Sequence, residues 1–255
     1  ACEDTRHTQA LLRAYGIDKS THQLLAVHQH NEAQAAQEIL ARLQAGQRVV
    51  YMSDAGTPGI SDPGARLAAA VAAAGLRVLP LPGASSITTA LSVAGAVAQG
   101  GGDQGFVFAG FLPTRSAERK AAVEMLRTEP RCIVVLEAPH RIADLAQALA
   151  VLEERPVTLA RELTKQFEQI TTLPAHQAAA WLQEDPQRCR GEFVVVLHPV
   201  ASSNDAEAGL RVLDRLLQEL PLKSAVRLAA DITGVPRNQL YEAALQRKNA
   251  PEQEG

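Results

Sequence analysis

Ionisable side chains gather directly after two apolar stretches in the second half of the chain. Glu137 follows the apolar run 132–136, while Arg161, Glu162 and Lys165 follow the run 157–160. Active sites concentrate such groups, although structural ion-pair networks produce the same pattern. Each residue alone is therefore weak support for catalysis, and the two clusters together mark where an active site is expected.

A second chemical signal lies in the stretch 48–64, RVVYMSDAGTPGISDPG. A short apolar run that ends in turn-forming residues is typical of a central parallel strand. Its glycines allow a ligand to approach the backbone closely, and its prolines stiffen the loop. Asp54 is an acceptor-only carboxylate that suits a ribose hydroxyl, an amine or a cation. A tight connection before a helix is the simpler alternative, but it needs fewer special residues, so we favour a ligand-binding loop.

The same pattern returns in the stretch 76–87, where a Pro-Gly break follows an apolar run and precedes Ser85 and Ser86. The two serines could be plain helix N-caps. Two successive strand ends rich in small residues, however, suggest the two walls of one cleft, because ligands of open α/β sheets bind outside the carboxyl ends of the strands.

The elements that must position these residues follow an α/β rhythm. Alternating strand and helix patterns predict two α/β domains, 1–112 and 113–199, and a helical module over 207–250. The expected strands are 24–27, 49–52, 76–81, 106–109, 132–136, 157–160, 167–172 and 191–197. The expected helices include 32–44, 65–74, 85–94, 142–152, 175–182, 208–220, 222–232 and 237–248. A glycine-rich segment, 99–103, is expected to be a loop or hinge.

The N-terminal region opens with a helix that Asp4 or Thr5 would cap and Gly16 would end. A domain of this kind normally begins with a strand, so we expect the first strand to be missing. His28 and His30 make a metal site conceivable, but no further ligand lies at suitable spacing. A polar loop in which Asn31 caps the helix 32–44 is the preferred interpretation.

Composition limits the class of protein. Of the 255 residues, 46% are hydrophobic and 21% are charged, which is ordinary for a soluble globular protein. No apolar segment approaches the ~20 residues of a membrane helix, and no signal peptide pattern is visible. Three distant cysteines suggest a reducing compartment, so the cytoplasm is expected. The net charge of −3 argues against bulk electrostatic capture of nucleic acid but permits a local basic face.

The C-terminal helices have a local excess of positive charge. Residues 229–241 resemble a helix-turn-helix, with small residues at the crossing and Gly234 in the turn. Residues 211–248 carry seven Lys or Arg against four Asp or Glu, the opposite sign from the whole chain. This modestly favours a nucleic-acid contact over a packing module.

Common nucleotide and hydrolase motifs are not found. The sequence has no GxxxxGK[ST] phosphate loop, no strand-anchored GxGxxG and no GxSxG elbow. A cleft of Gly, Pro, Ser and Asp could still hold a nucleoside-type cofactor.

The sequence contains an ordered set of motifs: CEDTRHT (2–8), HQHNE (28–32), SDAGTPGISDPG (53–64), PLPGASSITTAL (80–91), GFLP (110–113), LEAPHR (136–141), ARELTKQFEQ (160–169) and RGEFVVV (190–196). This set resembles the ribosomal RNA small-subunit methyltransferase I family of the tetrapyrrole methylase superfamily. Any one of them would be weak, but their order covers nearly the whole chain.

This resemblance implies an S-adenosylmethionine-dependent enzyme that methylates the ribose 2′-oxygen of a cytidine in the decoding region of 16S rRNA. It also implies a homodimer of two-domain subunits with the cofactor between the domains, and no metal. By resemblance, the cofactor site comprises Asp54, Gly56, Thr57, Pro58, Ile60, Ser85, Ser86, Ala138, Leu163, Glu192 and Phe193. The family's first strand and its loop contribute to this cleft, and the sequence begins after them.

The reaction is an in-line displacement in which positioning matters most, and a ribose hydroxyl benefits from a base or a polarising cation. Lys165, Glu162, Glu137 and Arg161 are the candidate catalytic residues, with Lys165 and Glu162 expected nearest the acceptor. The RNA-binding candidates are Arg6, Arg115, Arg119, Lys120, Lys223 and Arg237. Two rivals stay open: a superfamily enzyme that methylates a tetrapyrrole or a translation factor, and a non-catalytic nucleic-acid-binding protein that senses the cofactor.

Overall fold

The computed structural model describes residues 1–28, 30–97, 105–200 and 203–249 of the chain. The expected loop at 99–103 lies outside the described residues. The chain forms two compact units, Ala1–Thr89 and Ala90–Gly255. None of the helices in the described part combines the length and apolar character that a membrane span requires.

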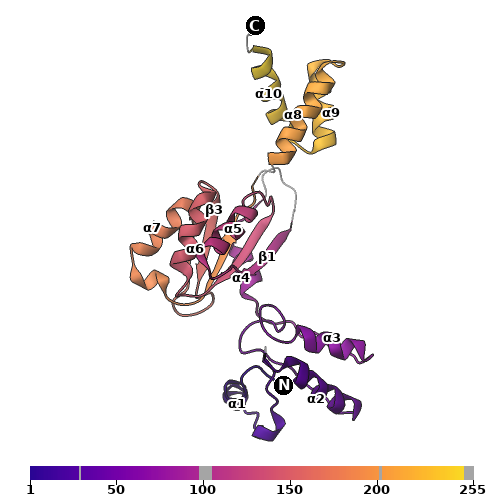
Figure 1. The fold of residues 1–255 in the computed structure, drawn as a ribbon, viewed down its shortest axis with the longest axis vertical. Helices are drawn as coiled ribbons and strands as arrows, with labels where there is room; N and C mark the ends of the chain where they lie inside the picture. The colour runs from indigo at the N-terminus through magenta and orange to yellow at the C-terminus, as the bar shows by residue number, and fades with distance from the viewer. Residues whose placement is uncertain (29, 98–104, 201–202, 250–255) are drawn as a thin grey trace. The chain divides into compact units, whose positions relative to one another are not determined.

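The first unit consists of helices packed on short extended segments (Figure 1). Its helices are α1 (Thr5–Ala14), η1 (Thr21–Gln23), α2 (Glu32–Gln44) and α3 (Ala65–Ala73), and α4 (Ser86–Ala94) begins within it. The side chain of Asp4 accepts from the backbone N–H groups of Arg6 and His7, which confirms the expected cap of α1. Ile39 of α2 and Leu67 and Val71 of α3 are buried in the core of this unit.

The strands expected in the first unit form only isolated bridges. Cys2 pairs in parallel with Ala26 and with Met52, so two of the expected strands do lie on either side of it. Each pairing is one residue long, and the expected strand 76–81 pairs with no described residue. The prediction of regular strands here was wrong because a strand is stabilised by a ladder of hydrogen bonds, not by its own apolar sequence.

The second unit contains a five-stranded mixed sheet in the order β1-β2-β5-β3-β4. Its strands are β1 (Phe106–Phe111), β2 (Cys132–Glu137), β3 (Pro156–Arg161), β4 (Gln169–Pro174) and β5 (Phe193–Leu197). Its helices are α5 (Ser116–Leu126), α6 (Ile142–Leu149), η2 (Ala150–Leu152), η3 (Ala175–Gln177), α7 (Ala178–Gln183) and η4 (Pro186–Cys189). β1 belongs to this sheet, whereas the sequence had suggested a domain boundary after it.

Strand direction brings four chain segments to one edge of this sheet. β1 and β2 are parallel, and β5 is antiparallel to both β2 and β3. The carboxyl ends of β1, β2 and β3 therefore meet the start of β5. Phe193 is paired with Glu137 on one side and with Arg161 on the other. This edge (residues 111–112, 137–141, 161–165 and 191–193) is called the site edge below.

A buried arginine closes the opposite end of the sheet. The guanidinium of Arg155 donates to the carbonyl oxygens of His198 (2.8 Å), Leu126 (2.9 Å) and Glu129 (3.2 Å). Buried polar groups need such partners, so this side chain joins the segment before β2 to the residue after β5.

Three helices complete the described chain: α8 (Ser203–Leu217), α9 (Leu222–Thr233) and α10 (Arg237–Asn249). They have their own apolar core, which includes Leu213, Val226 and Leu240. Gly234 ends α9 in the left-handed conformation (φ 75°), as a helix C-terminus commonly requires. The three expected helices are thus present in the expected order.

Candidate active site

The two loops predicted as walls of a cleft contact each other within the first unit. The hydroxyl of Thr57 donates to the carbonyl oxygen of Ala84 at 3.0 Å. The hydroxyl of Ser53 lies 3.1 Å from the Gly56 carbonyl oxygen and shapes the same turn. The loop 53–64 thereby lies against the residues directly before Ser85 and Ser86, with α4 starting at Ser86.

Asp54 lies beside the CEDTRHT motif. Its carboxylate accepts from the backbone N–H of Asp4 at 3.3 Å, and its own N–H lies 3.4 Å from the Glu3 carboxylate. The N–H groups of Arg6 and His7 lower the pKa of Asp4. Asp54 itself is exposed, as are Gly56, Pro58 and Ile60 of the same loop. The loop therefore offers a carboxylate acceptor and an open apolar side chain.

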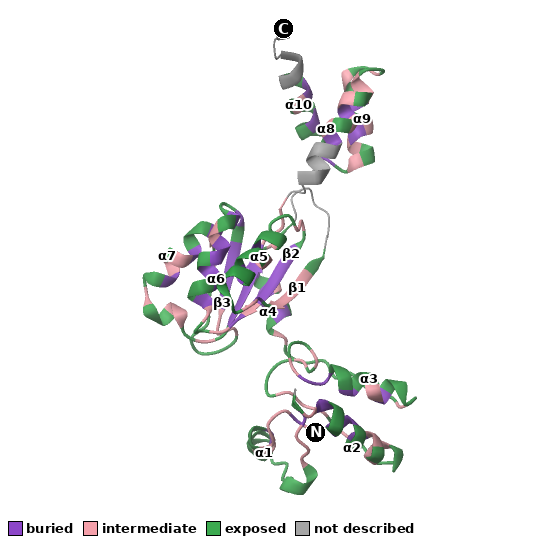
Figure 2. Ribbon diagram, viewed as in Figure 1, coloured by how far each residue is buried: buried purple, intermediate pink, exposed green. Residues whose placement is uncertain are grey.

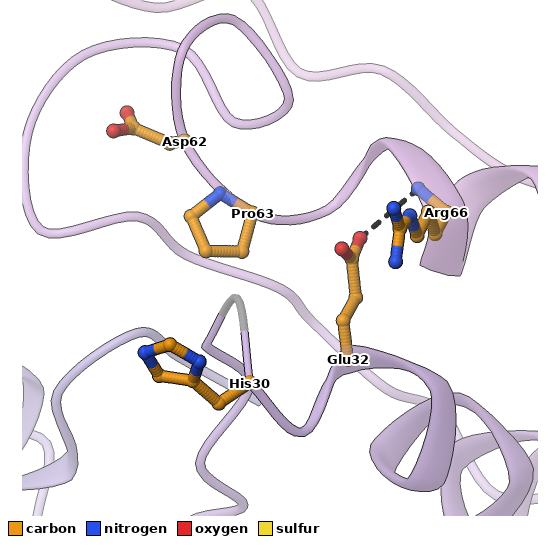
Figure 3. A pocket seen from close by; sticks show the side chains of 5 residues that line it. All are labelled: His30, Glu32, Asp62, Pro63 and Arg66. Atoms are coloured by element: carbon orange, nitrogen blue, oxygen red, sulfur yellow. Dashed lines mark hydrogen bonds between the residues drawn. The ribbon is translucent and has the colours of Figure 1, made fainter.

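Glu32 anchors the far end of this loop, a role that the sequence did not reveal. Its buried carboxylate oxygen Oε1 accepts from the N–H groups of Gly64 (2.9 Å) and Arg66 (3.0 Å), which begin α3 (Figure 3). The sequence placed Glu32 at the start of α2, where Asn31 was expected to be the cap. Asn31 does occupy that position, but its side chain binds the His28 N–H and the Ala26 carbonyl instead. A capping contact between residues so far apart leaves no local sequence signal.

Gly64 is required at the junction between the loop and α3. Its φ is 124°, and a Cβ atom there would lie 2.5 Å from the ring of Tyr51. The Tyr51 hydroxyl donates to the Pro63 carbonyl oxygen at 2.8 Å. Burial, followed by the nearby carboxylates of Glu3 and Asp62, raises the pKa of Tyr51, so its hydroxyl stays a donor.

An open hollow of about 380 Å³ lies beside this junction (Figure 3). Its lining residues are His30, Glu32, Asp62, Pro63 and Arg66. The rings of His28 and His30 lie edge to face at 6.1 Å. Among the described residues, no group of three or more His, Cys, Asp or Glu could hold a metal ion.

In the second unit, the site edge brings Lys165 between two carboxylates. The Lys165 ammonium lies 2.9 Å from Glu162 and 3.0 Å from Glu192. The Glu162 carboxylate also accepts from the backbone N–H of Glu192 at 2.9 Å, and the Glu162 N–H donates to the Glu192 carbonyl. Side chain and backbone together join the end of β3 to the start of β5.

This arrangement depends on unusual backbone conformations. Glu162 has a φ of 49°, which non-glycine residues seldom adopt. Gly191 has a φ of 83°, and a Cβ atom there would lie 2.3 Å from Cγ of Glu162. Strained residues of this kind persist where the surrounding structure holds them, often at functional sites.

The charges at the site edge reinforce one another. The backbone N–H of Glu192 and then Lys165 lower the pKa of Glu162. Hydrogen bonds to Glu162 and then Glu192 raise the pKa of Lys165. Lys165 is therefore held as an ammonium ion at neutral pH, and it can donate a hydrogen bond or stabilise negative charge but cannot act as a base.

Glu137 lies at the same edge but is fully buried. Its Oε1 accepts from the Ala138 N–H at 2.9 Å and lies 3.0 Å from Arg141 Nε. Arg141 also donates to the Leu112 carbonyl oxygen and so joins the ends of β1 and β2. The structure therefore gives no support to the expected catalytic role of Glu137, because its buried carboxylate contacts the Ala138 backbone and Arg141 and is closed to solvent.

Arg161 supports the neighbouring turn. Its guanidinium donates to the carbonyl oxygens of Gln187 (2.9 Å) and Arg190 (3.1 Å), directly before Gly191. Of the four candidate catalytic residues, Lys165 is exposed, Glu162 and Arg161 are half-buried, and Glu137 is buried. Ala138, Leu163, Glu192 and Phe193 lie along the same edge, with Phe193 buried in β5.

The basic residues predicted to hold RNA differ in availability. Arg119 is only 4% exposed; it donates to the carbonyl oxygens of Pro113 and Thr114 and pairs with Asp144 at 3.2 Å. The expectation of a surface contact by Arg119 is therefore corrected: it holds the start of α5 to α6. The other five are exposed: Arg6, Arg115, Lys120, Lys223 and Arg237.

Comparison with known proteins assigns the chain to a protein family. The model described as Tetrapyrrole (Corrin/Porphyrin) Methylases matches residues 1–179, and the one described as RsmI C-terminal HTH domain matches residues 203–248. The chain belongs to the tetrapyrrole methylase family. The family match and the structure confirm the predicted fold class: a mixed α/β sheet is followed by terminal helices.

Curated relatives narrow the position of this tetrapyrrole methylase within the family. Ribosomal RNA small subunit methyltransferase I of Escherichia coli O157:H7 is 44% identical over 97% of this chain and 85% of its own length. The protein of the same name in Pseudomonas aeruginosa is 44% identical over 97% of this chain and 87% of its own length. The tetrapyrrole methylase described here therefore belongs to the ribosomal RNA small subunit methyltransferase I group.

Solved structures agree on the fold of this tetrapyrrole methylase. Cobalt precorrin-4 methyltransferase has a TM-score of 0.50 at 16% identity, covering 76% of this chain and 81% of its own. Diphthine synthase has a TM-score of 0.50 at 12% identity, covering 74% of this chain and 72% of its own.

Proposed function

We propose that this chain is an S-adenosylmethionine-dependent methyltransferase that modifies the ribose 2′-oxygen of a cytidine in the decoding region of 16S rRNA. The observation that carries the proposal is the match along nearly the whole chain to curated relatives named for methylation of small-subunit ribosomal RNA. The exposed Lys165 ammonium at the site edge supplies a group suited to a hydroxyl acceptor.

The residues of the first unit suit the proposed cofactor. A carboxylate such as Asp54 can accept from ribose hydroxyls or an amino group. Ile60 is 43% exposed and offers apolar surface to a base. Gly56 has no side chain on the face toward the Ala84 carbonyl, which a Cβ atom would approach to 3.9 Å. Thr57 and Pro58 complete this part of the site, with Ser85 and Ser86 beside it.

By resemblance to the family, we propose that Ala138, Leu163, Glu192 and Phe193 of the second unit also contact the cofactor. When bound, S-adenosylmethionine supplies an electrophilic methyl group on sulfur. Glu137 and Arg141 fix the backbone of Ala138, and this is the role we assign to Glu137 in place of a catalytic one.

The acceptor hydroxyl needs help because it is a weak nucleophile at neutral pH. Lys165 can donate a hydrogen bond to the 2′-oxygen and stabilise the negative charge that develops as the O–H bond breaks. Glu162 and Glu192 keep the ammonium charged and aimed. The hydroxyl proton passes to solvent, since the described ion pairs leave Lys165 no capacity to accept it.

The deciding experiment is transfer of tritiated methyl groups from S-adenosylmethionine to small ribosomal subunits that lack their own methylation, followed by mapping of the labelled nucleotide. Label on a cytidine 2′-oxygen supports the proposal. Label on a porphyrinoid or a translation factor, with none on RNA, would support the superfamily rival. Cofactor binding without transfer to any of these substrates would support a sensor.

The proposal includes a homodimer in the cytoplasm and a reaction without a metal ion. The dimer is supported by resemblance to the family, and sedimentation of the purified chain would test it. Full activity in the presence of a chelator is the expected result for a metal-independent reaction.

A further inference from the structure

The helices α9 and α10 each have a row of exposed side chains, which is called the ridge of that helix below. On α9, Lys223, Arg227 and Asp231 are exposed and spaced four residues apart, so they lie along one side of the helix. On α10, Tyr241 follows Arg237 at the same spacing and is 38% exposed. Figure 2 shows exposed residues on both helices, outside the buried core.

An ion pair joins the two ridges. The guanidinium of Arg237 lies 2.8 Å from the Asp231 carboxylate, which connects the end of the α9 ridge to the start of the α10 ridge. Leu245 continues the α10 ridge and is 38% exposed. The α9–α10 surface is defined as Lys223, Arg227, Asp231, Arg237, Tyr241 and Leu245.

The charge of this surface favours a polyanion. Three cations face one carboxylate, although the whole chain has a net charge of −3. Asp231 neutralises Arg237, while neither Lys223 nor Arg227 forms an ion pair with a described side chain. These two cations are thus available to phosphate groups at no cost in broken ion pairs.

The exposed ring of Tyr241 indicates which kind of polyanion would bind. Unpaired bases stack on exposed aromatic rings, and stacking beside cations is the usual way to hold single-stranded RNA. A duplex would bury its bases and leave the Tyr241 ring without a partner.

We propose that the α9–α10 surface binds a single-stranded segment of ribosomal RNA, with Lys223 and Arg227 on phosphates and Tyr241 stacked on a base. The proposal rests on the proposed function and adds to it a substrate contact distinct from the site edge. Tyr241 and Arg227 are new assignments to RNA binding.

The test compares full-length variants in binding to a labelled single-stranded fragment of 16S rRNA and in methylation of small subunits. The K223Q/R227Q double variant should bind about tenfold more weakly and reduce the slope of log K against log salt by about 1.4. Tyr241→Ala should bind about tenfold more weakly, and Tyr241→Phe should restore binding because it keeps the ring. Arg215→Gln, a charge change on α8, is the matched control.

Two further sets of measurements distinguish a loss of RNA recognition from a loss of folding. Circular dichroism melting and affinity for S-adenosylmethionine should be unchanged in every variant. For methylation, the KM for subunits should rise while kcat at saturation stays the same.

Wild-type affinity for the RNA fragment in both the double variant and Tyr241→Ala would overturn the inference. Weaker binding to subunits with unchanged binding to RNA would also overturn it, since the surface would then contact a ribosomal protein. If the wild-type chain binds RNA but methylates none, the proposed function fails while the binding comparison still decides this surface. A chain that binds no RNA overturns both.

Discussion

At the scale of single residues, the charges around Lys165 determine which chemistry it can perform. Two carboxylates hold it as an ammonium, so we expect it to polarise the acceptor oxygen. Lys165→Gln should lower kcat about 100-fold, in the range typical of losing one electrostatic donor, with little change in cofactor affinity. Single-turnover methylation and calorimetric titration measure the two quantities.

Lys19→Gln, which removes an exposed cation of the first unit, is the control for overall charge and should keep full kcat. A Lys165→Gln enzyme of normal kcat would remove Lys165 from the mechanism.

Gly191 is a second residue whose effect can be predicted. In Gly191→Ala the new Cβ atom would displace Glu162, which releases Lys165 from one of its carboxylates. We expect a loss of about 1–2 kcal/mol in unfolding free energy from the left-handed conformation and a clear fall in kcat. Urea unfolding and initial rates provide the measurements.

Gly46→Ala separates backbone strain from collision, because Gly46 has a φ of 80° and no atom within 4 Å of an added Cβ. It should lose similar stability and keep its activity. Equal activity in the two variants would argue against the collision with Glu162.

At the scale of elements, Glu32 of α2 fixes the start of α3. Glu32→Ala leaves the N–H groups of Gly64 and Arg66 without their acceptor, and we expect a loss of about 2–3 kcal/mol in unfolding free energy. Glu32→Gln keeps an acceptor and loses only the charge opposite the helix dipole, about 1 kcal/mol. Glu38→Gln, an exposed change on the same helix, should cost less than about 0.5 kcal/mol. Equal costs at both positions would contradict the capping role.

A contact between β3, β4 and His198, the residue after β5, predicts that the free energy of unfolding depends on pH. The Thr158 hydroxyl lies 2.7 Å from that of Thr172 and 2.8 Å from Nε2 of His198. Burial and then Arg155 lower the pKa of His198 below its usual value near 6.5. The unfolded chain therefore binds this proton more readily, and the stabilisation is complete above about pH 6.5 and declines as the pH falls below it.

Urea unfolding from pH 7.5 to 5 should show this decline, and His198→Gln should flatten it while keeping a partner for Thr158. The carboxylates with lowered pKa values, such as Glu162, act only below about pH 4.5, outside this window. An unchanged slope in the variant would exclude His198 as the titrating group.

At the scale of the whole molecule, the sequence predicted what depends on local patterns. Helix ends, the buried strands of the second unit and the gathering of charged residues after them follow from turn formers and apolar runs. Arg119 could not be placed, because a buried and an exposed arginine on an amphipathic helix look alike until the neighbouring carbonyls are known. The hydrogen bonds from Glu32 to α3, and the absence of regular strand pairing among the described residues of the first unit, could not be predicted either. Both depend on contacts between residues that are far apart in the sequence.

The order of the strands has a consequence for synthesis of the chain. β5 lies between β2 and β3 although it is translated last among the strands of the described residues. Until residue 197 has left the ribosome, β2 and β3 have no common neighbour, and Lys165 lacks Glu192. Until then β2 and β3 each have one unpaired apolar side, although β1 and β4 pair with their other sides. Under the proposed mechanism, prompt insertion of β5 both completes the site and removes an aggregation-prone surface.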